Sequence, residues 1–134
     1  MEESDLGHRL RKDQIHKELQ LNMPRKSYED LNEKNKLLFL AGLFDGEGSF
    51  GIWGKGANRK TFQCSIEMKD RDILERFNDF FGGAITICKK RKPHWAQTWR
   101  WRLSGARAYE CVEMMIEYMS QRRQEKYENV VQCT

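Results

Sequence analysis

The segment 36–48 constrains the fold most, because a helical pattern, internal glycines and an acid all occur within it. Its apolar residues follow the i, i+3, i+4, i+7 spacing of one helical face. These residues are Leu37, Leu40, Ala41 and Phe44. We predict a helix that Gly46 and Gly48 break, which leaves Glu47 at its tip between two flexible residues.

A second face of the same helix carries Leu38, Gly42 and Gly46. A glycine inside a helix costs roughly 1 kcal/mol relative to alanine, so two of them four residues apart require an explanation. Bare backbone allows another helix to approach closely. We therefore expect this face to pack against a second helix.

After Gly48 the apolar period changes from helical to two, which is typical of half-buried strands. The predicted elements are strands at 49–55 and 61–68, a helix from Asp70 to Gly82, strands at 85–90 and 98–103, a helix at 106–119 and a shorter basic helix at about 122–131. Gly82 and Gly83 should stop the middle helix. The fold class is α+β, in the order α-β-β-α-β-β-α with a small helix added.

The domain boundary is expected near residue 30. Residues 1–30 are predicted to form a charged N-terminal arm or extension, and 31–134 the folded domain. Met23-Pro24 should end any helix in the arm, and Asn32 is the expected N-cap of the motif helix.

The nonapeptide from Leu40 to Gly48 resembles the motif of the LAGLIDADG homing endonucleases. Phe44 replaces isoleucine, and Gly46 and Glu47 replace alanine and aspartate. The resemblance implies an αββαββα fold, in which four antiparallel strands form a concave, DNA-binding saddle backed by helices. One copy of the motif occurs in the sequence, so the chain is similar to the homodimeric branch of that family.

The resemblance also implies a metal site and a subunit seam. Glu47 stands where the family has its metal-binding acid, and the carbonyl of Gly46 is expected to face the metal, Mg²⁺ or Mn²⁺. Divalent metals between carboxylates can activate water and neutralise charge during phosphodiester hydrolysis. The seam is expected to involve Leu38, Gly42, Asp45 and Gly46, with Asp45 in a structural role.

Two further positions matter for catalysis by the same resemblance. The end of the second strand often carries a water-ordering polar residue, but Met68 stands there, beside Glu67 and Lys69. Met68 is either a departure from the pattern or the last core residue of its strand. Lys69 and Arg122 are the basic catalytic candidates; Arg123 is an alternative to Arg122, and a helix-capping role is open for both.

The polar strand faces and hairpin tips are the expected DNA contacts. Glutamine and arginine can read adenine and guanine in the major groove, and basic tips suit phosphates. The strand candidates are Trp53, Lys55, Thr61, Gln63, Ser65, Thr86, Lys90, Arg100 and Arg102; the tip candidates are Arg59, Lys60, Lys89, Arg91 and Lys92. Trp99 and Trp101 are expected in the core.

Charge and composition agree with these expectations. Residues 55–107 hold thirteen basic and five acidic residues, whereas residues 1–36 hold eight of each. A basic centre suits phosphate binding. The 4 cysteines are widely spread, which favours reduced thiols. With no signal peptide and no long apolar run, we expect a soluble, intracellular protein that does not associate with membranes.

The resulting hypothesis is a site-specific homing endonuclease. It would act as a homodimer on double-stranded DNA and make a metal-dependent double-strand break in a long pseudo-palindromic site. The alternative is a protein of the same fold that binds DNA without cutting it, or an RNA maturase that assists a group I intron. Glu47 favours cutting, whereas Met68 favours binding alone.

Overall fold

The computed structural model describes Lys12 and residues 27–54 and 60–132. The predicted arm lies largely outside these residues, as do the DNA-contact candidates Lys55 and Arg59. Contacts between α-carbons divide the chain into two units, 1–36 and 37–134. A 3-10 helix, η1 (Tyr28–Asp30), lies in the first unit, and α2 (Glu33–Glu47) begins there and continues into the second. Asn32 caps α2 as predicted, because its Oδ1 accepts the Asn35 N–H at 2.8 Å.

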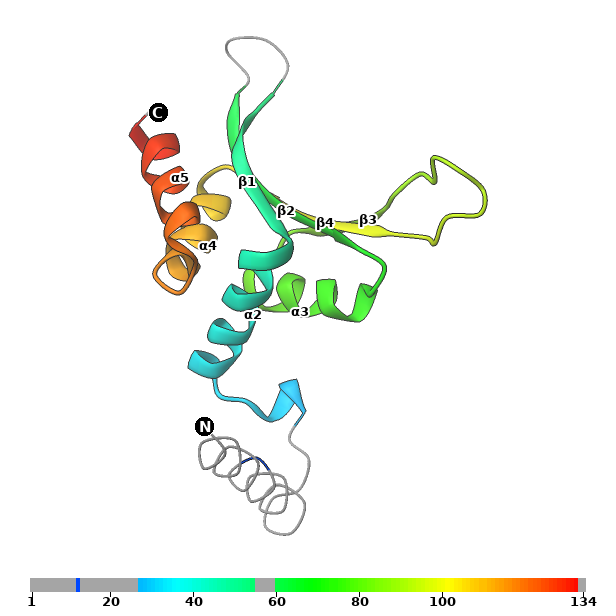
Figure 1. The fold of residues 1–134 in the computed structure, drawn as a ribbon, viewed down its shortest axis with the longest axis horizontal. Coiled ribbons are helices and arrows are strands. Elements are labelled where there is room, and N and C mark those ends of the chain that lie inside the picture. Colours follow the sequence, from blue (N-terminus) through cyan, green and yellow to red (C-terminus); the bar gives the residue numbers. More distant parts are fainter. Residues whose placement is uncertain (1–11, 13–26, 55–59, 133–134) are drawn as a thin grey trace, which may run out of the picture. The chain divides into compact units, whose positions relative to one another are not determined.

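The second unit is built on one antiparallel sheet of 4 strands in the order β1-β2-β4-β3 (Figure 1). Its strands are β1 (Gly48–Trp53), β2 (Thr61–Met68), β3 (Ala84–Ile87) and β4 (Trp99–Ser104). The two hairpins pair through β2 and β4. The predicted α+β class and the predicted order of helices and strands are confirmed.

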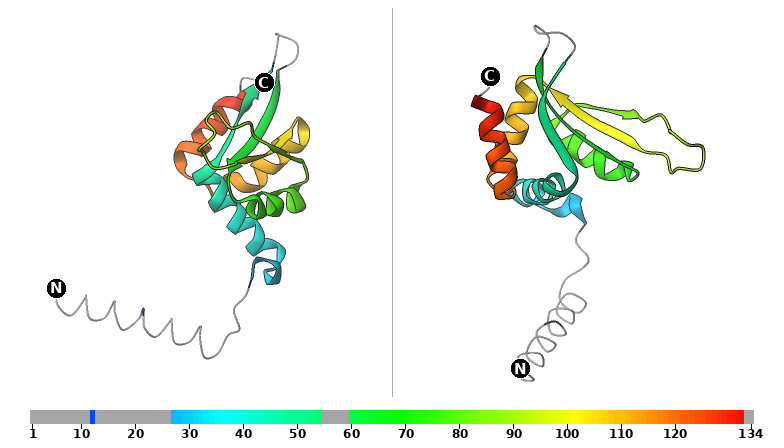
Figure 2. Two further views of the ribbon diagram at one scale, coloured as in Figure 1. Left: turned by 90° about the vertical axis from the view of Figure 1, so that its right-hand side faces the viewer. Right: turned by 45° about the horizontal axis from the view of Figure 1, so that its top comes forward.

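One face of the sheet is covered by helices and the other is open (Figure 2). The helices are α3 (Arg71–Phe81), α4 (Ala106–Ile116) and α5 (Gln121–Gln132). Apolar side chains at alternate strand positions are buried beneath them: Phe50, Phe62, Cys64, Ile66, Trp101 and Leu103. Period-two alternation thus separates a packed face from a polar face.

The turn between α3 and β3 uses glycine as expected. Gly82 and Gly83 have φ of 82° and 115°, a region that other residues rarely adopt. The indole Nε1 of Trp101 donates to the Gly82 carbonyl at 2.9 Å, which ties this turn to the core. Asp70 is the N-cap residue of α3, but its side chain makes no capping hydrogen bond.

Several predicted boundaries were wrong. Gly46 does not break the helix: α2 continues to Glu47, and β1 begins at the next residue. The predicted helix 106–119 ends at Ile116 and continues as a turn. β3 ends at Ile87, so Lys90 lies in a loop rather than on a strand. Trp101 is fully buried as expected, whereas Trp99 is only half-buried.

None of the described helices is both long and apolar enough to span a membrane.

Candidate functional site

The end of α2 presents Glu47 to solvent. Phe44 is fully buried and stacks on Phe50, with ring centroids 6.3 Å apart, so the last helical turn is anchored in the core. Glu47 follows as the final helical residue and is exposed. The C-terminal turn of a helix leaves carbonyl groups without helical partners, and the helix dipole favours cations there.

Two contacts hold this helix end, one from Ser120, just before α5, and one from Arg123 within α5. The backbone N–H of Ser120 donates to Asp45 Oδ1 at 3.0 Å. The guanidinium Nη2 of Arg123 donates to the carbonyl of Gly48 at 2.6 Å. Asp45 and Gly48 lie on either side of Glu47 in the chain, so these two contacts hold the segments before and after the exposed acid.

Arg123, rather than Arg122, is the residue that reaches the helix end. Arg123 is buried, and its Nε has no hydrogen-bond partner among the described residues. Burial, with the charge of Arg122 nearby, lowers the pKa of Arg123. Burial and these two arginines also lower the pKa of Lys126. Arg122 is exposed. Arg122, Arg123 and Lys126 form a group of three cations on α5, and Arg123 is the one that contacts the backbone next to Glu47.

The donors at this helix end fit a hard divalent cation. Mg²⁺ prefers carboxylate and carbonyl oxygens and keeps several waters, and Glu47 with the Gly46 carbonyl offers both kinds of oxygen. Within the described part of the chain, no three His, Cys, Asp or Glu side chains gather as a metal site.

The end of β2 lies at the same end of the sheet as Glu47, because Gly48 pairs with Ile66 in antiparallel register. Met68 shares the alternation of the buried residues of β2 and is half-buried. Lys69 follows the strand and is exposed. Glu67 lies on the polar face, and sequence reasoning did not assign it a role.

The outward face of α2 carries the residues that the sequence assigned to a seam. Leu38 is 38% exposed, and Gly42 and Gly46 are exposed as well. A β-carbon at either glycine would meet nothing within 4 Å. The described part of the chain therefore leaves both glycine positions uncovered.

The polar strand face brings together the predicted DNA-contact residues of the strands. In register, Trp53 pairs with Thr61, Ser65 with Arg102, and Thr86 with Arg100. Directly paired residues project to the same side of a sheet. The face also includes four polar residues that were not among the predicted DNA contacts: Ser49, Glu67, Thr98 and Ser104. Their alternation with the core residues was the signal for all four.

Neighbouring residues on this face contact one another. Gln63 Nε2 donates to the Trp53 carbonyl at 3.2 Å, and the hydroxyl oxygens of Ser49 and Ser65 are 3.2 Å apart. The indole of Trp53 lies across Gly51, where a β-carbon would come within 2.9 Å of Cζ2. Gly51 thus allows the indole to lie against the strand.

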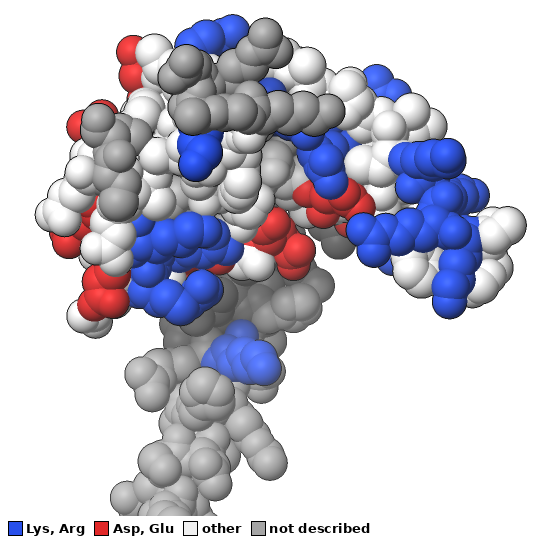
Figure 3. All heavy atoms as spheres, turned by 90° about the horizontal axis from the view of Figure 1, so that it is seen from above, with Lys and Arg blue, Asp and Glu red and all other residues white. Residues whose placement is uncertain are grey.

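The β3–β4 loop carries the densest group of basic residues. Gln97 closes the base of this loop, because its Nε2 donates to the carbonyls of Cys88 and Thr98 at 2.6 and 2.8 Å. Lys92 Nζ lies 5.5 Å from the ring centroid of Trp95. Figure 3 shows basic side chains gathered over this loop and, separately, over α5. Lys60, at the other hairpin, is exposed.

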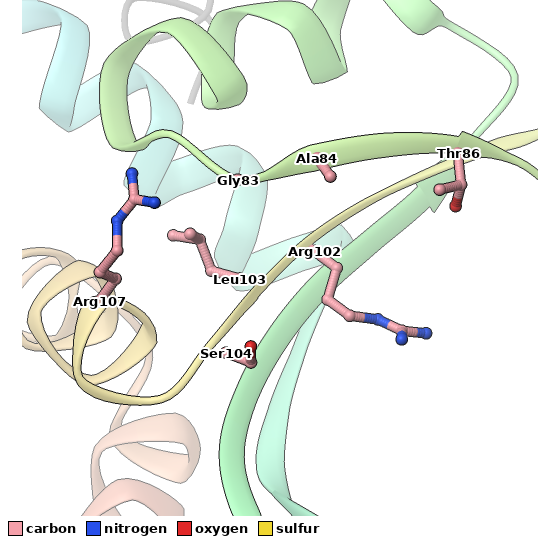
Figure 4. Close-up of a pocket in the computed structure, with 7 residues that line it drawn as sticks. All are labelled: Gly83, Ala84, Thr86, Arg102, Leu103, Ser104 and Arg107. Carbon is pink, nitrogen blue, oxygen red and sulfur yellow. The ribbon is translucent and has the colours of Figure 1, made fainter.

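A hollow of about 400 Å³ lies beside the edge strand β3 (Figure 4). Arg102 and Thr86 point to one side of the sheet, whereas Leu103 and Arg107 lie on the other. Arg107 Nη2 donates to the Phe81 carbonyl at 3.3 Å, so this arginine supports the α3–β3 turn. Arg102 is the basic residue that this edge contributes to the polar face.

Comparison with known proteins gives one family. The sequence model for the LAGLIDADG endonuclease matches residues 40–133. This range begins at the first residue of the nonapeptide and covers both hairpins, α3, α4 and α5. No curated protein matched the chain.

Solved structures share the fold. The group I intron-encoded homing endonuclease I-CeuI, complexed with DNA, matches with a TM-score of 0.57 over 96% of this chain and 66% of its own, at 15% identity. The LAGLIDADG homing endonuclease I-LtrWI, bound to target DNA, also gives 0.57, over 84% of this chain and 39% of its own, at 18% identity. The archaeal intron-encoded homing endonuclease I-Vdi141I, complexed with DNA, matches with a TM-score of 0.47 over 65% of this chain and 55% of its own, at 23% identity. This chain therefore spans about two thirds or less of the length of these proteins.

Proposed function

This chain belongs to the LAGLIDADG endonuclease family, and on that premise we propose that it is a homodimeric homing endonuclease. It binds a long, pseudo-palindromic duplex site and cuts both strands with the help of a divalent metal. The observation that carries the proposal is the position of Glu47. An exposed carboxylate ends a helix whose outward face bears glycines, at the edge of an open polar sheet.

The open sheet face supports duplex DNA as the substrate. It presents arginine, glutamine and hydroxyl groups at alternate strand positions, which can donate to and accept from base edges in the major groove. The basic β3–β4 loop would contact phosphates and supply affinity that is independent of sequence. The two-fold symmetry of a homodimer would match a pseudo-palindromic site.

The α2 surface supports dimerisation by the same chain. Two copies that meet along Leu38, Gly42 and Gly46 would approach closely, because neither glycine has a side chain. The end of each α2 would then bring one Glu47 to the two-fold axis. The bond between Asp45 and Ser120 would keep each helix end in a fixed orientation there.

The reaction follows from the groups at that axis. When bound, Mg²⁺ or Mn²⁺ supplies a nucleophilic water and neutralises charge on the phosphate. Glu47 and the Gly46 carbonyl would hold the ion. Arg123 fixes the backbone after Glu47, and Arg122 and Lys126 would stabilise negative charge on the scissile phosphate. Lys69, exposed at the end of β2, is a further candidate for that role.

Glu47→Gln tests the proposal, because it keeps the shape of the side chain and removes its charge. The cognate site is first selected from a randomised duplex pool with the wild-type protein. Site binding is then measured by gel shift, and cleavage with Mg²⁺ or Mn²⁺. We expect binding near the wild-type level and cleavage lower by several orders of magnitude, since the lost interaction acts in the transition state.

Glu113→Gln is the matched control, because Glu113 is an exposed acid on α4 away from the helix end. It should bind and cleave as the wild type does. If Glu47→Gln cleaves at the wild-type rate, the metal site is elsewhere and the assignment of Glu47 fails.

A non-cutting DNA-binding protein is the second candidate, and the position of Met68 favours it. Met68 alternates with the core residues of β2 and is half-buried, and a thioether orders water poorly. A wild-type protein that selects a site but cleaves it with neither metal would support this candidate. Stimulation of group I intron splicing in vitro would identify the maturase role.

A further inference from the structure

Three side chains lie in a row across the open sheet face, near the ends of β2 and β3 and the start of β4. Arg100 on β4 lies opposite Glu67 on β2 and opposite Thr86 on β3. Arg100 Nη2 donates to Glu67 Oε1 at 2.7 Å. Thr98 Oγ1 donates to the other carboxylate oxygen, Oε2, at 3.2 Å. Glu67 therefore holds two groups of β4 at once, one with each oxygen.

These three residues line a hollow of about 580 Å³. The basic loop residues 89–91 and Trp95 also line it. The side chains of Arg100 and Glu67 are 40% and 44% exposed, so both can reach a molecule that enters. In solution such an exposed ion pair adds little to stability. A role in recognition explains the presence of the Glu67 carboxylate among the cations of this hollow better than a role in stability does.

The pairing determines what Arg100 can still bind. A guanidinium has five N–H donors in a planar fork, and one bond goes to Glu67. The remaining donors suffice for a bidentate contact to the O6 and N7 acceptors of guanine. A phosphate would also accept from this arginine, but the charge of Glu67 would repel it. The pair therefore favours a neutral base edge and disfavours the backbone, which is a form of selection against the wrong partner.

We propose that Glu67 is a specificity-determining residue that orients Arg100 to read a guanine in the major groove. The inference rests on the proposed function, in which the open sheet face binds duplex DNA. Glu67 lies at the same end of the β1–β2 pair as Glu47, so the guanine read by this pair lies near the centre of the site. A two-fold dimer would read one such base in each half-site.

The protonation state of Glu67 is suited to this role. The hydrogen bond from Arg100 is the main cause that holds the pKa of Glu67 below its ordinary value of 4.5. A depressed pKa means that the pair is intact above the ordinary value and is lost as the pH falls through the lowered one. Recognition through Glu67 should therefore not change across the neutral pH range.

The test compares the base preferences of variants. Wild type, Glu67→Gln, Arg100→Gln and the double variant each select sites from a randomised duplex pool, and selected sites are ranked by competition. We expect Glu67→Gln to reduce the preference for one symmetric pair of guanines by on the order of tenfold. Arg100→Gln should affect the same pair, and the double variant should lose little more. Overall affinity for random DNA should rise for Glu67→Gln, because a negative charge is removed.

Glu75→Gln is the matched control, since Glu75 also pairs with an arginine, Arg71, at 3.3 Å but on α3. It should keep every base preference. Thr98→Val is a second test, because it removes the hydroxyl hydrogen bond to Glu67. It should weaken the same guanine preference, but less than Glu67→Gln does. Thermal melting compares the stability of all variants with the wild type.

Two outcomes distinguish failure of the inference about Glu67 from failure of the proposed function. If Glu67→Gln tightens binding to all sequences and leaves the preferences unchanged, Glu67 is only a repulsive charge and the inference is wrong, while DNA binding stands. If the wild type enriches no sequence from the pool, the proposed function fails and the inference falls with it.

Discussion

The ring of Phe44 closes over Gly48, at the junction where α2 becomes β1. A β-carbon built on Gly48 would lie 2.5 and 2.6 Å from Phe44 Cε2 and Cγ. Phe44 cannot withdraw easily, because it is fully buried and stacked on Phe50. The helix can therefore pass directly into the strand at Glu47 only if the residue that follows has no side chain.

Gly48→Ala should destabilise the protein by about 1–3 kcal/mol, the usual range for overpacking a core. Chemical denaturation measures the loss. Glu113→Ala, at an exposed position on α4 outside the proposed subunit seam, is the control. An unfolding free energy for Gly48→Ala equal to that of the wild type would contradict the close contact.

Arg123→Met should lower both stability and cleavage. It removes the donor to the Gly48 carbonyl and leaves a buried acceptor unpaired, which costs about 1–3 kcal/mol. With the backbone after Glu47 released, cleavage should fall more than site binding. Denaturation, gel shift and cleavage assays measure the three quantities separately.

Arg122→Met separates the roles of the two arginines. Arg122 is exposed, so its loss should change stability by less than about 0.5 kcal/mol while cleavage still drops. Should Arg122→Met destabilise the fold as much as Arg123→Met, the two residues would not have the separate roles described above.

Gly42→Leu should separate the subunits and abolish DNA binding. The subunit itself has room for the new side chain, but a leucine would keep a partner helix from approaching. Sedimentation at micromolar concentration, with and without the selected site, measures the association. Glu113→Leu adds a leucine to an exposed position on α4 and should leave the dimer intact. A wild-type protein that sediments as a monomer even with its site would rule out the homodimer.

Lys92→Ala should weaken binding to all duplexes alike. Lys92 is an exposed residue of the β3–β4 loop, where we expect phosphate contact. The loss of one phosphate contact should reduce the slope of log affinity against log salt by about 0.9. Titrations at several salt concentrations, on the selected site and on random DNA, measure that slope. A loss confined to the selected site would indicate base reading instead.

The sequence by itself determined the elements and their faces. Alternation along β2 and β4 identified the buried and the polar residues, because a side chain's face in a strand depends only on its spacing from its neighbours. The spacing around Leu40 and Phe44, with the acid that follows, likewise placed Glu47 at a helix end. These features are local in the chain and need no knowledge of what packs against them.

The exact junction between helix and strand at Glu47 could not be predicted from the local sequence. The sequence predicted a helix broken by Gly46, whereas the packed Phe44 ring and the pairing of Gly48 with Ile66 carry the helix directly into the strand. Tertiary contacts at this point outweigh the low helix propensity of glycine, which is a difference of only about 1 kcal/mol.

Only the tertiary structure decided which charged residues work together. Glu67 meets Arg100 because β2 pairs with β4 rather than with the next strand in sequence. Arg123, not its neighbour Arg122, reaches Gly48 because α5 turns that face of the helix toward β1. Both contacts join residues far apart in the chain, and strand order and helix orientation are set by the burial of the whole core. No local pattern around Glu67 or Arg123 could reveal its partner.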